Sequence, residues 1–126
     1  MTMSEMLKQY GEVVGFHAMD SLMVIADMLR GKKIVHVNST KEGGGVAEIL
    51  SSMIPLSKEL GLDVSWEVVE GNPDFFACTK TLHSALQGMP GGLPERQIEA
   101  YVETNRTNAA KLNDVLEDAD YVFIHD

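Results

Sequence analysis

Cysteine, basic side chains and long apolar runs are all scarce in this chain of 126 residues. Its single cysteine, Cys78, cannot form a disulfide within the chain. Ten Lys and Arg stand against nineteen Asp and Glu, and the resulting net charge of −9 argues against a nucleic-acid or membrane surface. Because no apolar stretch could span a bilayer and no secretory signal opens the chain, we expect a cytoplasmic protein.

The common motifs for nucleotides and metals are missing as well. Gly43 and Gly45 begin a dinucleotide fingerprint, G-x-G-x-x-G, but Glu48 occupies the position of its third glycine. No Gly-Lys-Ser or Gly-Lys-Thr follows, so a P-loop is excluded. The His, Asp and Glu spacings match neither H-x-E nor H-x-x-x-H, and we expect no metal site.

A glycine loop between a strand and a helix is the most prominent local pattern. The β-branched run from Ile34 to Val37 indicates a strand, three glycines follow at 43–45, and apolar residues then recur at helical spacing from Val46. The first amides of such a helix lack partners within it, and glycine lets a ligand approach them closely. We expect an anionic or polar ligand here, the alternative being a flexible turn that binds nothing.

Hydrophobic periodicity predicts the remaining elements. Residues 1–15 are predicted to be a loosely ordered lead-in with a short helix from Ser4 to Gln9. Amphipathic helices and strands follow, several of them bounded by glycine or proline. The helices are expected at 17–30, 45–60, 73–86 and 94–118, and the strands at 33–38, 63–69 and 120–125.

Strands separated by helices favour a parallel sheet with right-handed crossovers. We therefore expect residues 16–126 to form a partial Rossmann-like domain, a three-layer α/β/α arrangement with a short parallel sheet in the order 2-1-3. Strands one and three then become neighbours whose connections leave in opposite directions, which is the point where such sheets bind ligands. The glycines at 43–45 should meet His125 and Asp126 there.

His125 is the histidine best placed for ligand binding, because it ends a buried-type strand at the expected crevice. His36 lies inside a strand, and His17 begins a helix. His83 lies on the apolar side of the helix at 73–86, where packing is the alternative to ligand contact.

A set of short blocks carries a family resemblance. The blocks are His36 to Thr40, Gly43 to Leu50, Pro55-Leu56, Gly61, Trp66, Phe75-Phe76, Thr79-Lys80, His83, Leu86 to Gly88, Asn105 and Ile124 to Asp126. With these residues the chain resembles the N-terminal part of the trehalose glycosyl-transferring synthases, retaining glycosyltransferases of family four with the GT-B fold. The resemblance covers about residues 10 to 126, and the three-glycine block is its most specific part.

The resemblance implies a function and a set of contacts. Members make trehalose from a nucleoside-diphosphate glucose and glucose, with the acceptor sugar on the N-terminal domain and the nucleotide sugar on the C-terminal domain. Ser84 replaces an asparagine expected beside the acceptor. A divalent magnesium ion could accompany the donor in the complete enzyme, and this part of it would bind no cofactor of its own. The implied substrate contacts are Gly43, Gly44 and Gly45, which would border the donor diphosphate and the acceptor, and His125 and Asp126, of which His125 would close on the donor sugar. His83 and Gln87 are implied on the acceptor side.

Family members continue past this His-Asp pair into a whole nucleotide-binding domain. We therefore expect a truncated or deliberately shortened enzyme that is inactive alone. Its exposed sheet edge or core face would favour a homo-oligomer. The alternative is a stand-alone Rossmann-like binding or interaction module without catalysis.

Overall fold

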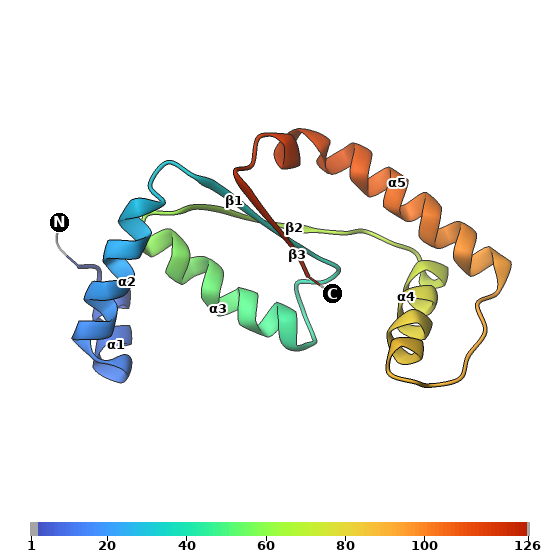
Figure 1. Cartoon of the computed structure of the whole chain (residues 1–126), viewed down its shortest axis with the longest axis horizontal. Coiled ribbons are helices and arrows are strands. Elements are labelled where there is room, and N and C mark those ends of the chain that lie inside the picture. Colours follow the sequence, from blue (N-terminus) through green and yellow to red (C-terminus); the bar gives the residue numbers. More distant parts are fainter. Residues whose placement is uncertain (1–2, 126) are drawn as a thin grey trace. The chain divides into compact units, whose positions relative to one another are not determined.

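A three-stranded parallel sheet organises the computed structural model, which describes residues 3–125 (Figure 1). The central strand is β1 (Lys33–Asn38), with β2 (Asp63–Val68) on one side and β3 (Tyr121–Ile124) on the other. Both neighbours run parallel to β1. The all-parallel pairing and the order 2-1-3 predicted from the sequence are confirmed, as is the Rossmann-like α/β class.

The chain divides into two units, and one of them consists of Val69–Asp114. The unit Val69–Asp114 contains α4 (Pro73–Leu86) and most of α5 (Glu95–Glu117), and the other unit contains the sheet with α1 (Glu5–Val14), α2 (Phe16–Met28) and α3 (Gly45–Glu59). Within the described residues, no helix is both long enough and apolar enough to cross a membrane.

One face of the sheet packs against α3, which runs along the strands (green in Figure 1). Successive residues of a strand point to opposite faces, so Ile34 shares a face with its neighbour in β2, Val64. Leu50 and Ile54 lie four residues apart on one side of α3 and complete a buried cluster with these two. Trp66 packs at the border of this cluster, and its indole N–H is thereby directed toward the end of β1.

A helical hairpin replaces the loosely ordered lead-in that the sequence predicts. The Ser4 hydroxyl accepts a hydrogen bond from the amide of Leu7 at 3.3 Å, which caps α1. Gly15 separates α1 from α2 with φ of 93°, a value that favours glycine. Gly11 does not interrupt α1, because its missing side chain makes room for Phe16, whose ring lies 2.7 Å from where a Cβ would be. As a result α2 packs mainly against α1, and α1 contacts α3.

In the unit Val69–Asp114, α4 begins as the sequence predicts. The side chain of Asn72 accepts a hydrogen bond from the amide of Phe75 at 2.8 Å, and Pro73 takes the first helical position. The buried ring of Phe75 stacks on Tyr101 of α5 with a centroid distance of 5.9 Å. The start of α4 is therefore held by a local cap and by an aromatic contact to the next helix.

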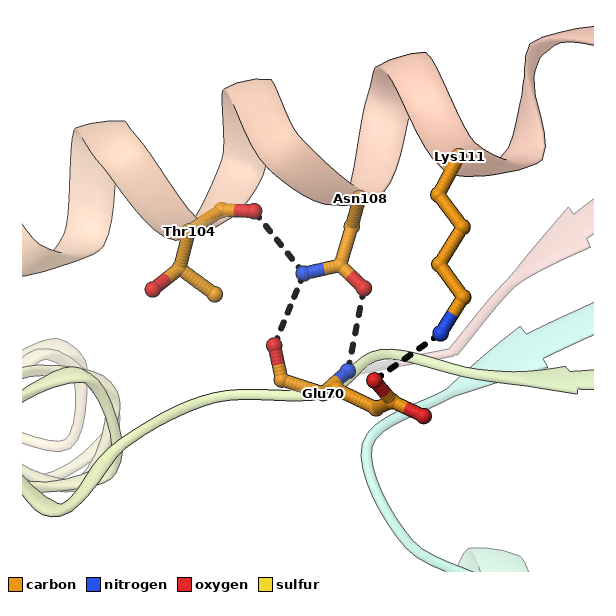
Figure 2. Close-up of polar contacts among 4 residues, drawn as sticks. All are labelled: Glu70, Thr104, Asn108 and Lys111. Atoms are coloured by element: carbon orange, nitrogen blue, oxygen red, sulfur yellow. Dashed lines mark hydrogen bonds and ion pairs between the residues drawn. The ribbon is translucent and has the colours of Figure 1, made fainter.

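Asn108 of α5 holds the backbone in front of α4 (Figure 2). Its side-chain oxygen accepts a hydrogen bond from the Glu70 amide at 3.0 Å, and its nitrogen donates to the Glu70 carbonyl at 2.8 Å. The same nitrogen donates to the Thr104 carbonyl, and Lys111 pairs with the Glu70 carboxylate at 2.8 Å. The side-chain amide of Asn108 thus pairs with both the amide and the carbonyl of Glu70, as the backbone of a neighbouring β-strand would.

The apolar strand β3 lies at the edge of the sheet, and its side chains are exposed. Asp120 fixes its start, donating to the Lys33 carbonyl at 2.9 Å and accepting from the Lys33 amide at 2.8 Å. The sequence pattern of Tyr121–Ile124 is that of a buried strand, yet exposure ranges from 41% at Val122 to 71% at Ile124. Within residues 3–125, β3 pairs with β1 alone.

Replacing Asn108 by alanine should destabilise the unit Val69–Asp114. The substitution removes both hydrogen bonds between the backbone of Glu70 and the buried side chain of Asn108, each contributing about 1 kcal/mol, and we expect a loss of about 2 kcal/mol in the free energy of unfolding by urea. Asn105→Ala is the matched control, because Asn105 is exposed on the same helix and bonds only to the Tyr101 carbonyl among the described residues. Equal losses in the two variants would contradict the role of Asn108.

The exposed edge strand should drive self-association of the 126-residue chain. We expect light scattering to report an oligomer that weakens with Ile124→Lys, because a charge on an edge strand opposes strand pairing. Val24→Lys is the control, since Val24 is a similarly exposed aliphatic residue, 64% exposed, on α2. A monomer at high concentration, or equal weakening by both variants, would reject this surface.

Candidate functional site

A cavity of about 210 Å³ lies at the carboxyl end of β1. Its walls come from the end of this strand, the glycine loop, the first turn of α3 and the residue after β3. Two larger hollows, of about 470 and 580 Å³, lie among α1, α2, α3 and the residues flanking them. The cavity at the strand ends is lined by Asn38, Ser39, Thr40, Gly43, Gly44, Gly45, Val46, Ala47 and His125.

The three glycines of the loop are needed for different reasons. Gly43 and Gly44 have φ of 74° and 85°, in the region that side chains rarely adopt. Gly45 has an ordinary φ, and a Cβ added there would meet no protein atom within 4 Å. Neither backbone conformation nor packing within the described residues therefore requires glycine at 45. Its missing side chain leaves open space on the cavity wall.

The first turn of α3 offers hydrogen-bond donors to the cavity. Gly44 is the N-cap, and no side chain of the described residues caps this helix. The first amide bonded within the helix is that of Glu48, to the Gly44 carbonyl at 3.2 Å. The amides of Gly45, Val46 and Ala47 precede it and lie at the positive end of the helix dipole. Glu48 places a carboxylate in the same turn, which weakens the attraction for an anion.

Asn38 connects the end of β1 to both the loop and β2. Only 5% of Asn38 is exposed. Its side-chain nitrogen donates to the Thr40 carbonyl at 2.6 Å, and its oxygen accepts from the indole N–H of Trp66 at 2.7 Å. The Lys41 ammonium lies 5.7 Å from the centre of the Trp66 ring. The exit path of the glycine loop is thus fixed by a buried amide that the sequence analysis did not single out.

His125 lies beside His36, a contact that the sequence analysis did not anticipate. The amide of His125 donates to the Val37 carbonyl at 2.9 Å, which continues the pairing of β3 with β1. Nδ1 of His36 is 2.9 Å from Nε2 of His125, and the two ring planes lie within 16° of each other with centroids 5.2 Å apart, so the rings meet edge to edge. On its other side His36 stacks against Phe123 at 4.8 Å. His36, which the sequence places inside a strand, is therefore in direct contact with His125, the residue predicted to bind the ligand.

Burial keeps His36 neutral. The residue is 6% exposed, and this burial lowers the pKa of its imidazole below the ordinary value. The charge of a protonated His125 would lower this pKa further, because two imidazolium rings at this distance repel each other. A neutral His36 has one ring nitrogen with a proton and one without, so its Nδ1 can serve as donor or acceptor in the contact with His125.

The remaining predicted contacts do not belong to this cavity. His83 and Gln87 are exposed on and just after α4, in the other unit, with their Nε2 atoms 3.0 Å apart. Asp126 lies outside the described residues. Residues 3–125 also contain no group of three or more His, Cys, Asp or Glu side chains arranged to hold a metal ion. The binding roles of the glycines, His83, Gln87 and His125 stay predictions.

Comparison with known proteins gives relatives that are named for trehalose. A family described as "Trehalose synthase, N-terminal domain" matches residues 36–126. The chain is 44% identical over 121 residues to a trehalose synthase of Thermococcus litoralis and 39% identical over 120 residues to one of Rubrobacter xylanophilus. Each alignment covers 95% of this chain but 29% of the relative. A trehalose phosphorylase of Pleurotus pulmonarius is 38% identical over 85 residues, 66% of this chain and 12% of that enzyme.

Acidification should destabilise the protein through His36. Because its pKa is lowered on folding, the unfolded chain binds a proton more readily, and stability falls as the pH drops below the ordinary value of about 6.5. We expect the thermal midpoint to decrease between about pH 7 and pH 5.5, above the range where most carboxylates titrate. His36→Phe should flatten this decrease, whereas His17→Phe, a change at an exposed histidine, should not. An unchanged pH profile in His36→Phe would contradict this assignment.

Proposed function

The chain belongs to the family of the trehalose synthase N-terminal domain, and we propose that it is the acceptor-side part of a trehalose-forming glycosyltransferase. In this proposal a GT-B enzyme transfers glucose from a nucleoside diphosphate to glucose, with retention of configuration. The family match and the 95% coverage of this chain support the assignment. The chain spans 29% of the length of those trehalose synthases, so the reaction belongs to the whole protein and not to this part alone.

The open wall at Gly45 is the observation that carries the proposal. A sugar hydroxyl needs both a donor and an acceptor when it leaves water, and the cavity offers helix amides on one side and an imidazole on the other. The bare backbone at Gly45 lets a ring carbon approach without meeting a side chain. In the proposal, Gly43 to Gly45 border the sugar, and His125 closes on it.

This part of the enzyme offers little to neutralise the negative charge of the departing diphosphate. Glycosyl transfer from a nucleotide builds negative charge on the departing diphosphate, and the transition state is stabilised where that charge develops. Glu48 and the net charge of −9 make the cavity a poor host for this charge. We therefore assign the binding of the diphosphate, and of any magnesium ion that accompanies it, to the remainder of the enzyme. The enzyme as a whole is proposed to act in the cytoplasm. The chain alone should bind sugar weakly and form no trehalose.

Gly45→Ala separates binding from folding. Alanine in a first helical turn with ordinary φ should leave the thermal midpoint unchanged or raise it, since it restricts the unfolded chain. The new methyl group adds bulk to a residue that lines the cavity, and we expect glucose and trehalose to bind at least about tenfold more weakly. The measurement is an NMR titration of the isotope-labelled chain that follows the amides of residues 43–47.

Gly92→Ala is the matched control for this titration. Gly92 also has an ordinary φ and no neighbour within 4 Å of an added Cβ, but it lies in the loop between α4 and α5. Its replacement should leave sugar binding as it is in the wild type. Normal binding by Gly45→Ala would move the site elsewhere. No response of the wild-type chain to glucose, trehalose or a nucleoside-diphosphate glucose would favour a binding module of another kind.

A further inference from the structure

We propose that His36 is a positioning residue that holds His125 in one tautomer, with Nε2–H of His125 donating to Nδ1 of His36. Nδ1 of His125 is then a bare acceptor, and the ligand group that it receives is a hydroxyl and not a phosphate. The second statement rests on the proposed function, because it takes His125 as the sugar contact. The first does not, because it concerns only the contact between the two histidines.

The geometry makes the contact between the two rings specific. The distance of 2.9 Å between Nδ1 of His36 and Nε2 of His125 is that of a direct hydrogen bond. The ring of His36 also stacks on Phe123, and the backbone of His125 is held by the bond from its amide to the Val37 carbonyl. These two contacts keep the residues that carry the rings side by side.

The direction of the bond follows from tautomer chemistry. A neutral imidazole carries one proton, so its two nitrogens have opposite roles. If Nε2 of His125 donates, both rings carry their proton on Nε2, the nitrogen that neutral histidine favours in water. The reverse bond would place both protons on Nδ1. The pair therefore selects the first arrangement and leaves Nδ1 of His125 without a proton.

A bare nitrogen at this place decides what the cavity can bind. An imidazole acceptor attracts an O–H group and repels the oxygen atoms of a phosphate. The amides of the first turn of α3, on another wall of the cavity, are donors. A hydroxyl satisfies both, because its oxygen accepts from an amide while its hydrogen is donated to His125. His36 thus contributes to specificity although the cavity lining does not include it.

Nitrogen-detected NMR of the labelled chain tests the tautomer directly. In the wild type we expect a proton on Nε2 of His125, a bare Nδ1, and a through-bond coupling to Nδ1 of His36. The exposed His17 gives the tautomer mixture of a free histidine in the same spectrum. A mixture at His125, a proton on its Nδ1, or no coupling would overturn the proposal without any variant.

Two variants then test whether His36 is the cause. His36→Phe keeps a flat ring between Phe123 and His125 but removes the acceptor, so His125 should shift to a mixture like that of His17. His36→Gln restores an acceptor oxygen and should return the single tautomer. We expect sugar affinity to fall about tenfold in the first variant and to recover in the second. A His125 tautomer that is the same in all three proteins would overturn the positioning role.

The outcomes also separate this inference from the proposed function. A single His125 tautomer that depends on His36, in a chain that binds neither glucose nor trehalose, supports the positioning role and counts against the proposed function. Sugar binding that is unaffected by His36→Phe supports the proposed function and rejects the role of His36. Inorganic phosphate serves as the probe for an anion, and saturable binding of phosphate near His125 would contradict a hydroxyl site.

Discussion

Two polar side chains buried on the central strand constrain everything at the ends of the strands. His36 and Asn38 lie two residues apart on β1, so both side chains point to the same face of the sheet. This is the face of Ile34, which packs against α3. An unsatisfied polar group at such a place would destabilise the fold by about 1–3 kcal/mol, and each side chain must therefore have its partners in position. Asn38 finds them in Trp66 and the Thr40 carbonyl, and His36 finds one in His125. One strand thus orients two walls of the cavity.

The parts of the fold that follow local patterns could be predicted from the sequence, and the parts that follow long-range register could not. The β-branched run before the glycines and the connectivity of the strands are enough to give the order 2-1-3. The His36 pair joins residues 89 apart in the chain, and it depends on the alignment of β3 with β1. The Asn108 bond to Glu70 spans 38 residues in the same way. A histidine in a strand or an asparagine in a helix has the same local pattern with or without such a partner.

Gly45 shows a further limit of reading glycines from a sequence alone. All three glycines of the loop look alike in the sequence, yet only Gly43 and Gly44 take conformations that favour glycine. Gly11 lies inside α1, where it admits the ring of Phe16. The role of a glycine depends on the atoms that would meet its missing side chain. That information exists only after the chain has folded.

The charge balance of the cavity favours a neutral ligand over an anion. The N-terminus of a helix attracts negative charge by about 0.3–1 kcal/mol for an exposed group, but Glu48 offers such a charge in the first turn already. Burial keeps His36 uncharged, so this imidazole brings no positive charge to the neighbourhood of the cavity. No fixed positive side chain lines the cavity among the described residues. The donors that remain are dipoles, and dipoles of this kind bind hydroxyl groups without requiring the ligand to carry charge.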